Sequence, residues 1–181
     1  MTSSNHWQEI RTLWKAAEER PVATRHVVQV LRRHFHEAGI VERMAAFEDF
    51  VRQTSIQGQV NGFRWGATDC SLMVADWCLA NGHDDPAASW RGQYGDEASC
   101  RALVAERGDL VAVLDACAIS VGLKRIHEPE FGCVAVVGSK SNAERQWAAI
   151  WNGARWAVWL GNADGVQWQP MMAKGLTMWR V

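Results

Sequence analysis

Apolar residues in the first quarter of the chain recur at the three- and four-residue spacing of amphipathic helices. A first predicted helix covers about residues 6–19 and ends before Pro21, because proline removes a backbone donor and restricts the residue before it. A second runs from Val27 to Gly39, and a third begins near Met44. The apolar positions that define the second and third helices are Val27, Val30, Leu31, Phe35, Met44, Phe47, Phe50 and Val51.

A fourth predicted helix starts at Cys70, where Thr68 or Asp69 can serve as the N-cap, and ends near Asn81. The apolar positions that follow Cys70 at spacings of four, seven and eight are Val74, Trp77 and Cys78. This side of the helix therefore faces a core, while the Cys70 sulfur lies in the first turn.

The second half of the chain changes from helical to strand periodicity. Two short helices come first, one from Asp96 to Gly108 and one from Asp109 to about Gly122. The predicted strands cover residues 133–137, 148–151, 155–159, 166–169 and 177–181. Asn152-Gly153 is a strong signal for a two-residue hairpin turn between the second and third of these strands. Helices followed by a small antiparallel sheet indicate an α+β domain.

Composition narrows the possible functions. The chain has 181 residues, 48% of them hydrophobic, and a formal net charge of −1, so it can bury a sizeable core and offers no basic surface for nucleic acid. No segment is long and apolar enough to span a membrane, and the N-terminus lacks a signal-peptide pattern. The five cysteines form no Cys-x-x-Cys pair, so we expect no disulfide framework, metal or cofactor. His26, His34 and His36 are spaced as solvated helix-face residues.

Cys70 is the candidate nucleophile. A helix N-terminus presents unpaired N–H groups and the positive end of the helix dipole, which both favour a thiolate. Asp69 acts in the opposite direction, since an adjacent carboxylate raises the pKa of the thiol. The alternative is that Cys70 is a small buried apolar residue, the commonest fate of a free cysteine.

The residues around Cys70 also carry a family resemblance. The order Phe63-x-Trp65-Gly66-x-x-Asp69-Cys70 resembles the nucleophile motif of the NlpC-type cysteine peptidases, papain-like enzymes that cut peptide bonds in bacterial peptidoglycan. A phage-encoded branch of that clan is similar in its further landmarks as well. These landmarks are Ala75-Asp76-Trp77, Trp90-Arg91-Gly92-Gln93-Tyr94 and Trp179-Arg180-Val181. The resemblance implies an NlpC-like domain over residues 41–181 and leaves residues 1–40 as an N-terminal helical extension.

The same resemblance predicts that the catalytic base is missing. NlpC-type enzymes place a histidine on the strand that corresponds to residues 147–153, and here Trp147 occupies its position. An indole N–H donates but cannot accept a proton, so it cannot act as a general base. The polar residue that orients the histidine should fall near Val158. His83 and His127 are the remaining candidates for a base, although neither lies on the expected strand.

The resemblance implies that the protein is a bacteriophage or prophage tail component that acts at the distal tail end. It would be made in the host cytoplasm and then be located in the virion. We expect other tail proteins and peptidoglycan as partners, and a fold that has lost hydrolysis. One alternative is an active peptidase that cleaves stem peptides through Cys70. The other is a non-catalytic wall-binding module with a groove formed by Trp65, Trp147 and Trp151. The N-terminal helices either dock on another tail protein or pack on their own domain.

Overall fold

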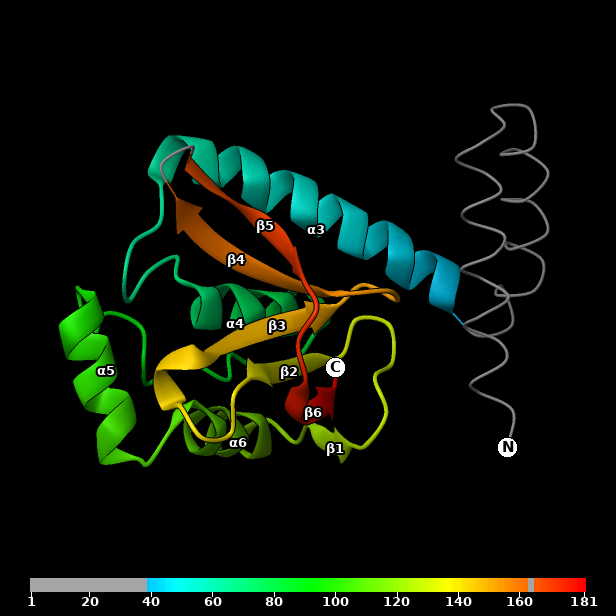
Figure 1. The fold of residues 1–181 in the computed structure, drawn as a ribbon. Coiled ribbons are helices and arrows are strands. Elements are labelled where there is room, and N and C mark those ends of the chain that lie inside the picture. Colours follow the sequence, from blue (N-terminus) through cyan, green and yellow to red (C-terminus); the bar gives the residue numbers. More distant parts are fainter. Residues whose placement is uncertain (1–38, 163–164) are drawn as a thin grey trace. The chain divides into compact units, whose positions relative to one another are not determined.

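The computed structural model describes residues 39–162 and 165–181 and has an α+β fold (Figure 1). The described helices are α3 (Ile40–Asn61), α4 (Cys70–Ala80), α5 (Glu97–Glu106) and α6 (Leu110–Ser120). The predicted helices from Met44, Cys70, Asp96 and Asp109 are therefore confirmed. The helices predicted before Gly39, and with them the N-terminal extension, lie outside the described residues. The chain divides into units of residues 1–46 and 47–181, and the second unit contains the whole sheet and the candidate site.

The second half of the chain forms a six-stranded antiparallel sheet in the order β1-β6-β2-β3-β4-β5. Its strands are β1 (Lys124–Ile126), β2 (Val134–Gly138), β3 (Gln146–Trp151), β4 (Trp156–Asn162), β5 (Gly165–Met171) and β6 (Gly175–Arg180). Sequence periodicity missed β1, which has three residues, and the 3-10 helix η2 (Ala143–Arg145). His127, one of the two candidate replacement bases, follows β1 directly.

The hairpin between β3 and β4 is a two-residue turn, but it is shifted by one position from the prediction. Asn152 and Arg155 close the turn, with the Asn152 N–H 3.1 Å from the Arg155 carbonyl, so the central residues are Gly153 and Ala154. Gly153 has φ +92°, which suits the first central position, and the Asn152 side chain accepts from the backbone N–H of Arg155 at 2.7 Å. Asn152 therefore stabilises the turn from outside its centre.

The core lies on the two faces of the sheet. Trp77 of α4 is fully buried and donates its indole N–H to the Gly132 carbonyl at 2.8 Å. From Phe47 on, α3 packs along β4 and β5, where Trp168 donates to the Thr54 hydroxyl at 2.9 Å (Figure 1). A Cβ at Gly58 would lie 2.5 Å from the Trp159 ring, so this crossing needs glycine. None of the helices in the described part of the chain is long and apolar enough to cross a bilayer.

The sheet opens between β3 and β4, and this opening positions the candidate site. Within the described residues, the two strands pair at Ile150 with Ala157 and at Trp151 with Trp156, both next to the hairpin. Beyond these pairs β3 follows β2, while β4 follows β5. The start of α4 packs against both strands at this point. Cys70 therefore lies where the sheet divides.

A candidate active-site cleft at Cys70

The loop before α4 is organised by the buried carboxylate of Asp69. This side chain is 1% exposed and caps α4 by accepting from the N–H groups of Ser71 (3.1 Å) and Leu72 (3.2 Å). Its second oxygen accepts from the Gly66 N–H at 2.9 Å and from the Tyr94 hydroxyl at 2.8 Å. Of the two predicted N-caps, Asp69 is thus the one observed. Four donors satisfy this carboxylate, so burial does not leave it unpaired.

Gly66 allows the loop before α4 to contact the segment that contains Gly92 and Tyr94. Its φ is +71°, and a Cβ there would lie 2.0 Å from the Tyr94 carbonyl oxygen. The Gly92 N–H donates to the Gly66 carbonyl at 2.9 Å, which joins the same two segments from the other side. Trp159 of β4 anchors the loop to the sheet by donating to the Thr68 carbonyl at 2.9 Å. The glycine is therefore required by close packing and by its backbone conformation.

The landmark residues Asp76 and Arg91 form an ion pair. Arg91 lies 2.7 Å from an Asp76 oxygen and also binds Asp85 through two nitrogens, at 2.7 and 3.2 Å. The hydrogen bond from Arg91 holds the pKa of Asp85 below its ordinary value, whereas burial raises the pKa of Asp76. This cluster ties the end of α4 to the following loop. The sequence alone left open whether Asp76 and Arg91 pair or bind a ligand, and their contacts are those of a pair.

The C-terminal landmark contacts other parts of the same domain. Trp179 of β6 is almost fully buried and donates to Asp115 of α6 at 3.2 Å. Arg180 pairs with Glu130, with a 2.7 Å contact from Nε. All the landmarks that carry the resemblance thus have packing or hydrogen-bonding roles in this fold.

Cys70 is the first residue of α4 and is partly buried against the sheet. Burial, and then the negative charge of Asp69, raise the pKa of its thiol to about 11. Hydrogen bonds from the backbone of Ala148 and from Ser71 act in the opposite direction without overcoming burial. The thiolate expected from the helix N-terminus is therefore disfavoured, because the cost of desolvation exceeds the stabilisation from the helix end.

A cleft of about 340 Å³ opens beside Cys70. Its walls come from the start of α4, from α5, and from the segment that joins η2 to β3. Of the predicted groove residues, Trp65 and Trp147 line this cleft. Trp151 does not line it, since its ring packs on Trp156 next to the hairpin, with the ring centroids 4.9 Å apart.

The rim of the cleft carries paired charges. Arg101 of α5 contacts Glu97 of the same helix at 2.6 Å and Glu144 of η2 at 3.5 Å. All three residues line the cleft, and the second contact joins α5 to η2. Sequence analysis did not identify this rim. The four-residue spacing of Glu97 and Arg101 is that of an ordinary exposed helical pair, and no local pattern links either residue to Glu144.

No imidazole lines the cleft among the described residues. Trp147 of β3 lines the cleft together with Cys70, and Val158 of β4 is fully buried in the apolar cluster that both residues pack against. His83 and His127, the two candidate replacements, are absent from its walls. The described part of the chain also has no group of three or more histidine, cysteine or carboxylate side chains that could hold a metal ion. The arrangement places a cleft of ligand size beside a protonated thiol, and within the described residues it supplies no imidazole to act as a general base.

Comparison with known proteins gives one match. Residues 42–181 match the family model described as a domain of unknown function, DUF6950. No curated protein and no solved structure matches the chain.

Proposed function

The chain belongs to the DUF6950 family, and from that premise we propose that residues 41–181 are a papain-like, NlpC-type domain that has lost hydrolysis and serves as a phage or prophage tail component. The single observation that carries the loss of hydrolysis is the composition of the Cys70 cleft. It holds the thiol at a helix N-terminus, but a tryptophan in place of a base.

Support for the papain-like arrangement comes from the position of Cys70. The thiol lies at the first residue of a buried helix, and this helix packs against the point where an antiparallel sheet divides. The strand β3, which α4 contacts, begins with Gln146 and Trp147, and in this proposal it corresponds to the strand that carries the base in NlpC-type enzymes.

Thiol chemistry argues against cleavage. A papain-type reaction needs a thiolate to attack the carbonyl carbon and an imidazolium to protonate the leaving amine. With a pKa of about 11, roughly one Cys70 in ten thousand would be ionised at pH 7. Trp147 can neither take the thiol proton nor return it to an amine. Both halves of the reaction therefore lack their acid–base partner.

The proposal of a tail component rests on the sequence landmarks shared with the phage-encoded branch. In this role the domain would contact other tail proteins at the distal end and would be found in the virion. A proteomic analysis of particles purified from a strain that encodes the chain should detect it in the tail fraction. Its recovery from cells alone, with none in purified tails, would contradict this part of the proposal.

A second candidate, a non-catalytic wall-binding module, is favoured by the open cleft. Trp65 and Trp147 offer aromatic surface for stacking on a sugar ring, and a cleft of about 340 Å³ has the size of a small-ligand site. Pull-down with insoluble peptidoglycan tests it. Binding that is lost in the Trp65→Ala and Trp147→Ala variants and kept in Trp151→Ala supports this function, whereas no binding by the wild type contradicts it.

The loss of hydrolysis is tested by incubating the purified full chain with peptidoglycan and measuring released peptides by mass spectrometry. Wild type and Cys70→Ala should be equally inactive. Release by the wild type that is abolished in Cys70→Ala would overturn the proposal and restore the alternative of an active peptidase. An active NlpC-type enzyme run in parallel shows that the substrate can be cleaved.

A further inference from the structure

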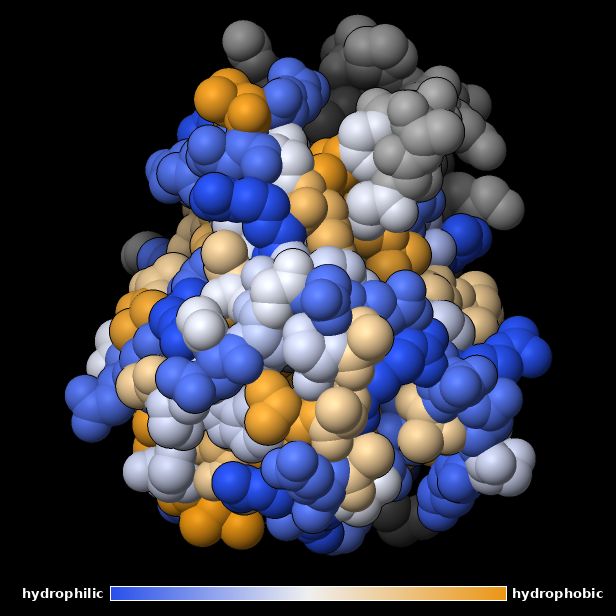
Figure 2. Space-filling view, turned by 90° about the vertical axis from the view of Figure 1, so that its left-hand side faces the viewer, coloured by the Kyte–Doolittle hydropathy of each residue, from blue (hydrophilic) through white to orange (hydrophobic). Residues whose placement is uncertain are grey.

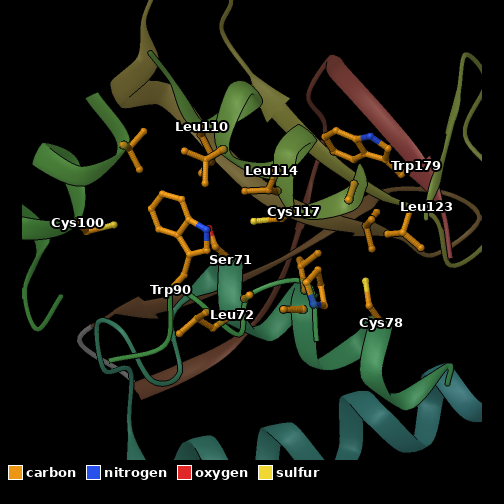
Figure 3. A pocket seen from close by; sticks show the side chains of 18 of the residues that line it. Ser71, Leu72, Cys78, Trp90, Cys100, Leu110, Leu114, Cys117, Leu123 and Trp179 are labelled. Carbon is orange, nitrogen blue, oxygen red and sulfur yellow. The ribbon is translucent and has the colours of Figure 1, made fainter. Parts of the chain in front are cut away.

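A second, smaller hollow lies behind the cleft, between α4, α5 and α6 (Figure 3). Its volume is about 60 Å³. Figure 3 shows Leu110 and Leu114 above it, Leu72 below it, and the rings of Trp90 and Trp179 on either side. The lining is almost entirely apolar, so the hollow suits an apolar guest better than water, which needs two to four polar partners.

The hollow and the cleft share part of their walls. The residues that line both are Ser71, Cys100, Val104 and Leu110. Ser71 follows Cys70 directly, so the two spaces adjoin at the first turn of α4. A molecule that entered through the polar cleft could therefore place an apolar end between these four side chains and into the hollow.

The outer wall of both spaces is α5, which is weakly held. This helix has no buried residue and is flanked by Gly95 and Gly108. Two exposed contacts from this segment reach the rest of the domain, the Arg101–Glu144 ion pair and the Arg107 guanidinium 5.5 Å from the Trp90 ring centroid. Each kind of contact is weak at a solvated position, so α5 is restrained mainly by the packing of its half-buried side chains Cys100, Leu103 and Val104.

The surface on the side of α5 offers no obvious alternative site for an apolar partner. Figure 2 views this side of the molecule, where hydrophilic side chains predominate and the apolar ones form small separate groups. A continuous apolar lining is found in the hollow, whose walls include Cys100 and Val104 of α5.

We propose that the hollow binds the short alkyl group of a small neutral amphiphile, whose polar end remains in the cleft. A water-sized group needs up to about 15 Å³ of cavity volume and a methylene group has about that size, so the hollow of about 60 Å³ accepts a chain of roughly four carbons. A neutral polar end needs no counter-ion, whereas an anionic end is disfavoured because Glu97 and Glu144 place two carboxylates beside the single guanidinium of Arg101. Binding requires no chemistry at Cys70, so this proposal is independent of the proposed function.

Tryptophan indole N–H signals in the NMR spectrum of the full chain provide the test. Trp90 and Trp179 report on the hollow, Trp65 and Trp147 report on the cleft, and Trp156 serves as a remote control. In a titration with 1-butanol, we expect saturable shifts at Trp90 and Trp179, with a Kd on the order of millimolar. Butane-1,4-diol, which has the same length and a hydroxyl at each end, should produce none.

Alcohols of different chain length, and a variant with a larger side chain in the hollow, provide two further tests. From ethanol to 1-butanol the Kd should fall up to about fourfold for each added methylene group, and 1-hexanol should bind no more tightly than 1-butanol. Ala118→Leu adds bulk to a buried wall residue of α6 and should weaken 1-butanol binding at least tenfold. Ala112→Leu on the exposed side of α6 should not.

Two results would overturn the proposal. One is a linear, non-saturating response to 1-butanol. The other is an equal response to the diol, because a site that accepts a hydroxyl at both ends is not an apolar hollow. Both comparisons use the wild-type chain, so they remain decisive even if Ala118→Leu fails to fold.

Discussion

On one side of the Cys70 cleft, the loop before α4 is held by a dense set of contacts. Asp69, Gly66 and Tyr94 interlock there, and Trp159 ties the loop to the sheet. On the other side, Trp147 of β3 lines the cleft and Val158 of β4 is buried in the adjoining apolar cluster, and neither side chain can accept a proton. The contrast teaches that the sequence landmarks around Cys70 are accounted for by packing and hydrogen bonds, and that they are not by themselves evidence of a reaction.

Asp69→Ala should cause the largest loss of stability, because it removes the acceptor of four hydrogen bonds. Buried donors left without a partner cost more than the bonds contribute when formed, so we expect the free energy of unfolding to fall by about 3–5 kcal/mol. Urea denaturation followed by tryptophan fluorescence measures it. Asp96→Ala removes the exposed cap of α5 and should cost much less, because its donors can bind water instead. Equal losses of unfolding free energy in the two variants would mean that the buried Asp69 carboxylate contributes no more to stability than an exposed helix cap.

Gly66→Ala should rank next, at about 3 kcal/mol, since the new Cβ meets a backbone carbonyl and the φ of +71° disfavours an L side chain. Gly62→Ala is the matched control. Gly62 has a φ of +69°, and no atom lies within 4 Å of the position that a Cβ would take, so that variant should show the conformational cost alone, about 1 kcal/mol. The same denaturation experiment compares them. A difference below the measurement error would contradict the close approach between Gly66 and Tyr94.

Much of the fold could be predicted from local sequence. Apolar spacing and capping aspartates indicated α4, α5 and α6, because a helix is specified by neighbours within one or two turns. The three residues of β1 gave no periodicity to detect, and they become a strand through pairing with β6. The hairpin shifted by one residue because the Asn152 side chain bonds outside the central pair.

The site was harder to predict than the fold. Cys70 and Trp147 were identified from a motif and its expected partner strand. The bond from Tyr94 to Asp69 and the contact of Arg101 with Glu144 join residues 25 or more positions apart, so no local pattern could reveal them. The helix end at Cys70 indicated a reactive thiol, but burial by the sheet determines its pKa. Burial of that kind is a tertiary property.

Trp147→His tests the side of the cleft that lacks an imidazole. A histidine on β3 that reaches Cys70 would stabilise the thiolate as an ion pair, so alkylation of Cys70 at pH 7 should accelerate roughly tenfold. Hydrolysis should remain slow, because Val158 leaves the new imidazole without an orienting partner. Trp151→His, on the same strand but outside the cleft, should leave the rate unchanged. Identical rates for both variants and the wild type would show that position 147 does not face the thiol as proposed.

The smallest expected effect concerns the Arg91 cluster. Because Arg91 lowers the pKa of Asp85, this pair stabilises the folded state above the unfolded pKa of about 4, and the benefit is lost as the pH falls through the lower folded value. Asp85→Asn should therefore cost about 1 kcal/mol at pH 7 and progressively less as the pH is lowered below about 4. Asp76→Asn should cost less at pH 7, because burial already penalises that charge and raises its pKa. Denaturation curves across this pH range measure both variants, and a pH-independent loss in Asp85→Asn would contradict the ion-pair account.

The central claim, that Cys70 has no acid–base partner, is tested most directly by its alkylation rate as a function of pH. Peptide mapping after timed exposure to iodoacetamide isolates Cys70 from the other four cysteines. We predict a rate that rises about tenfold per pH unit through neutrality towards a midpoint of about 11, and at pH 7 lies roughly a hundredfold below that of an ordinary thiol. A rate that is already on a plateau between pH 5 and pH 8 would contradict the account, because it would require a thiolate stabilised by a partner cation.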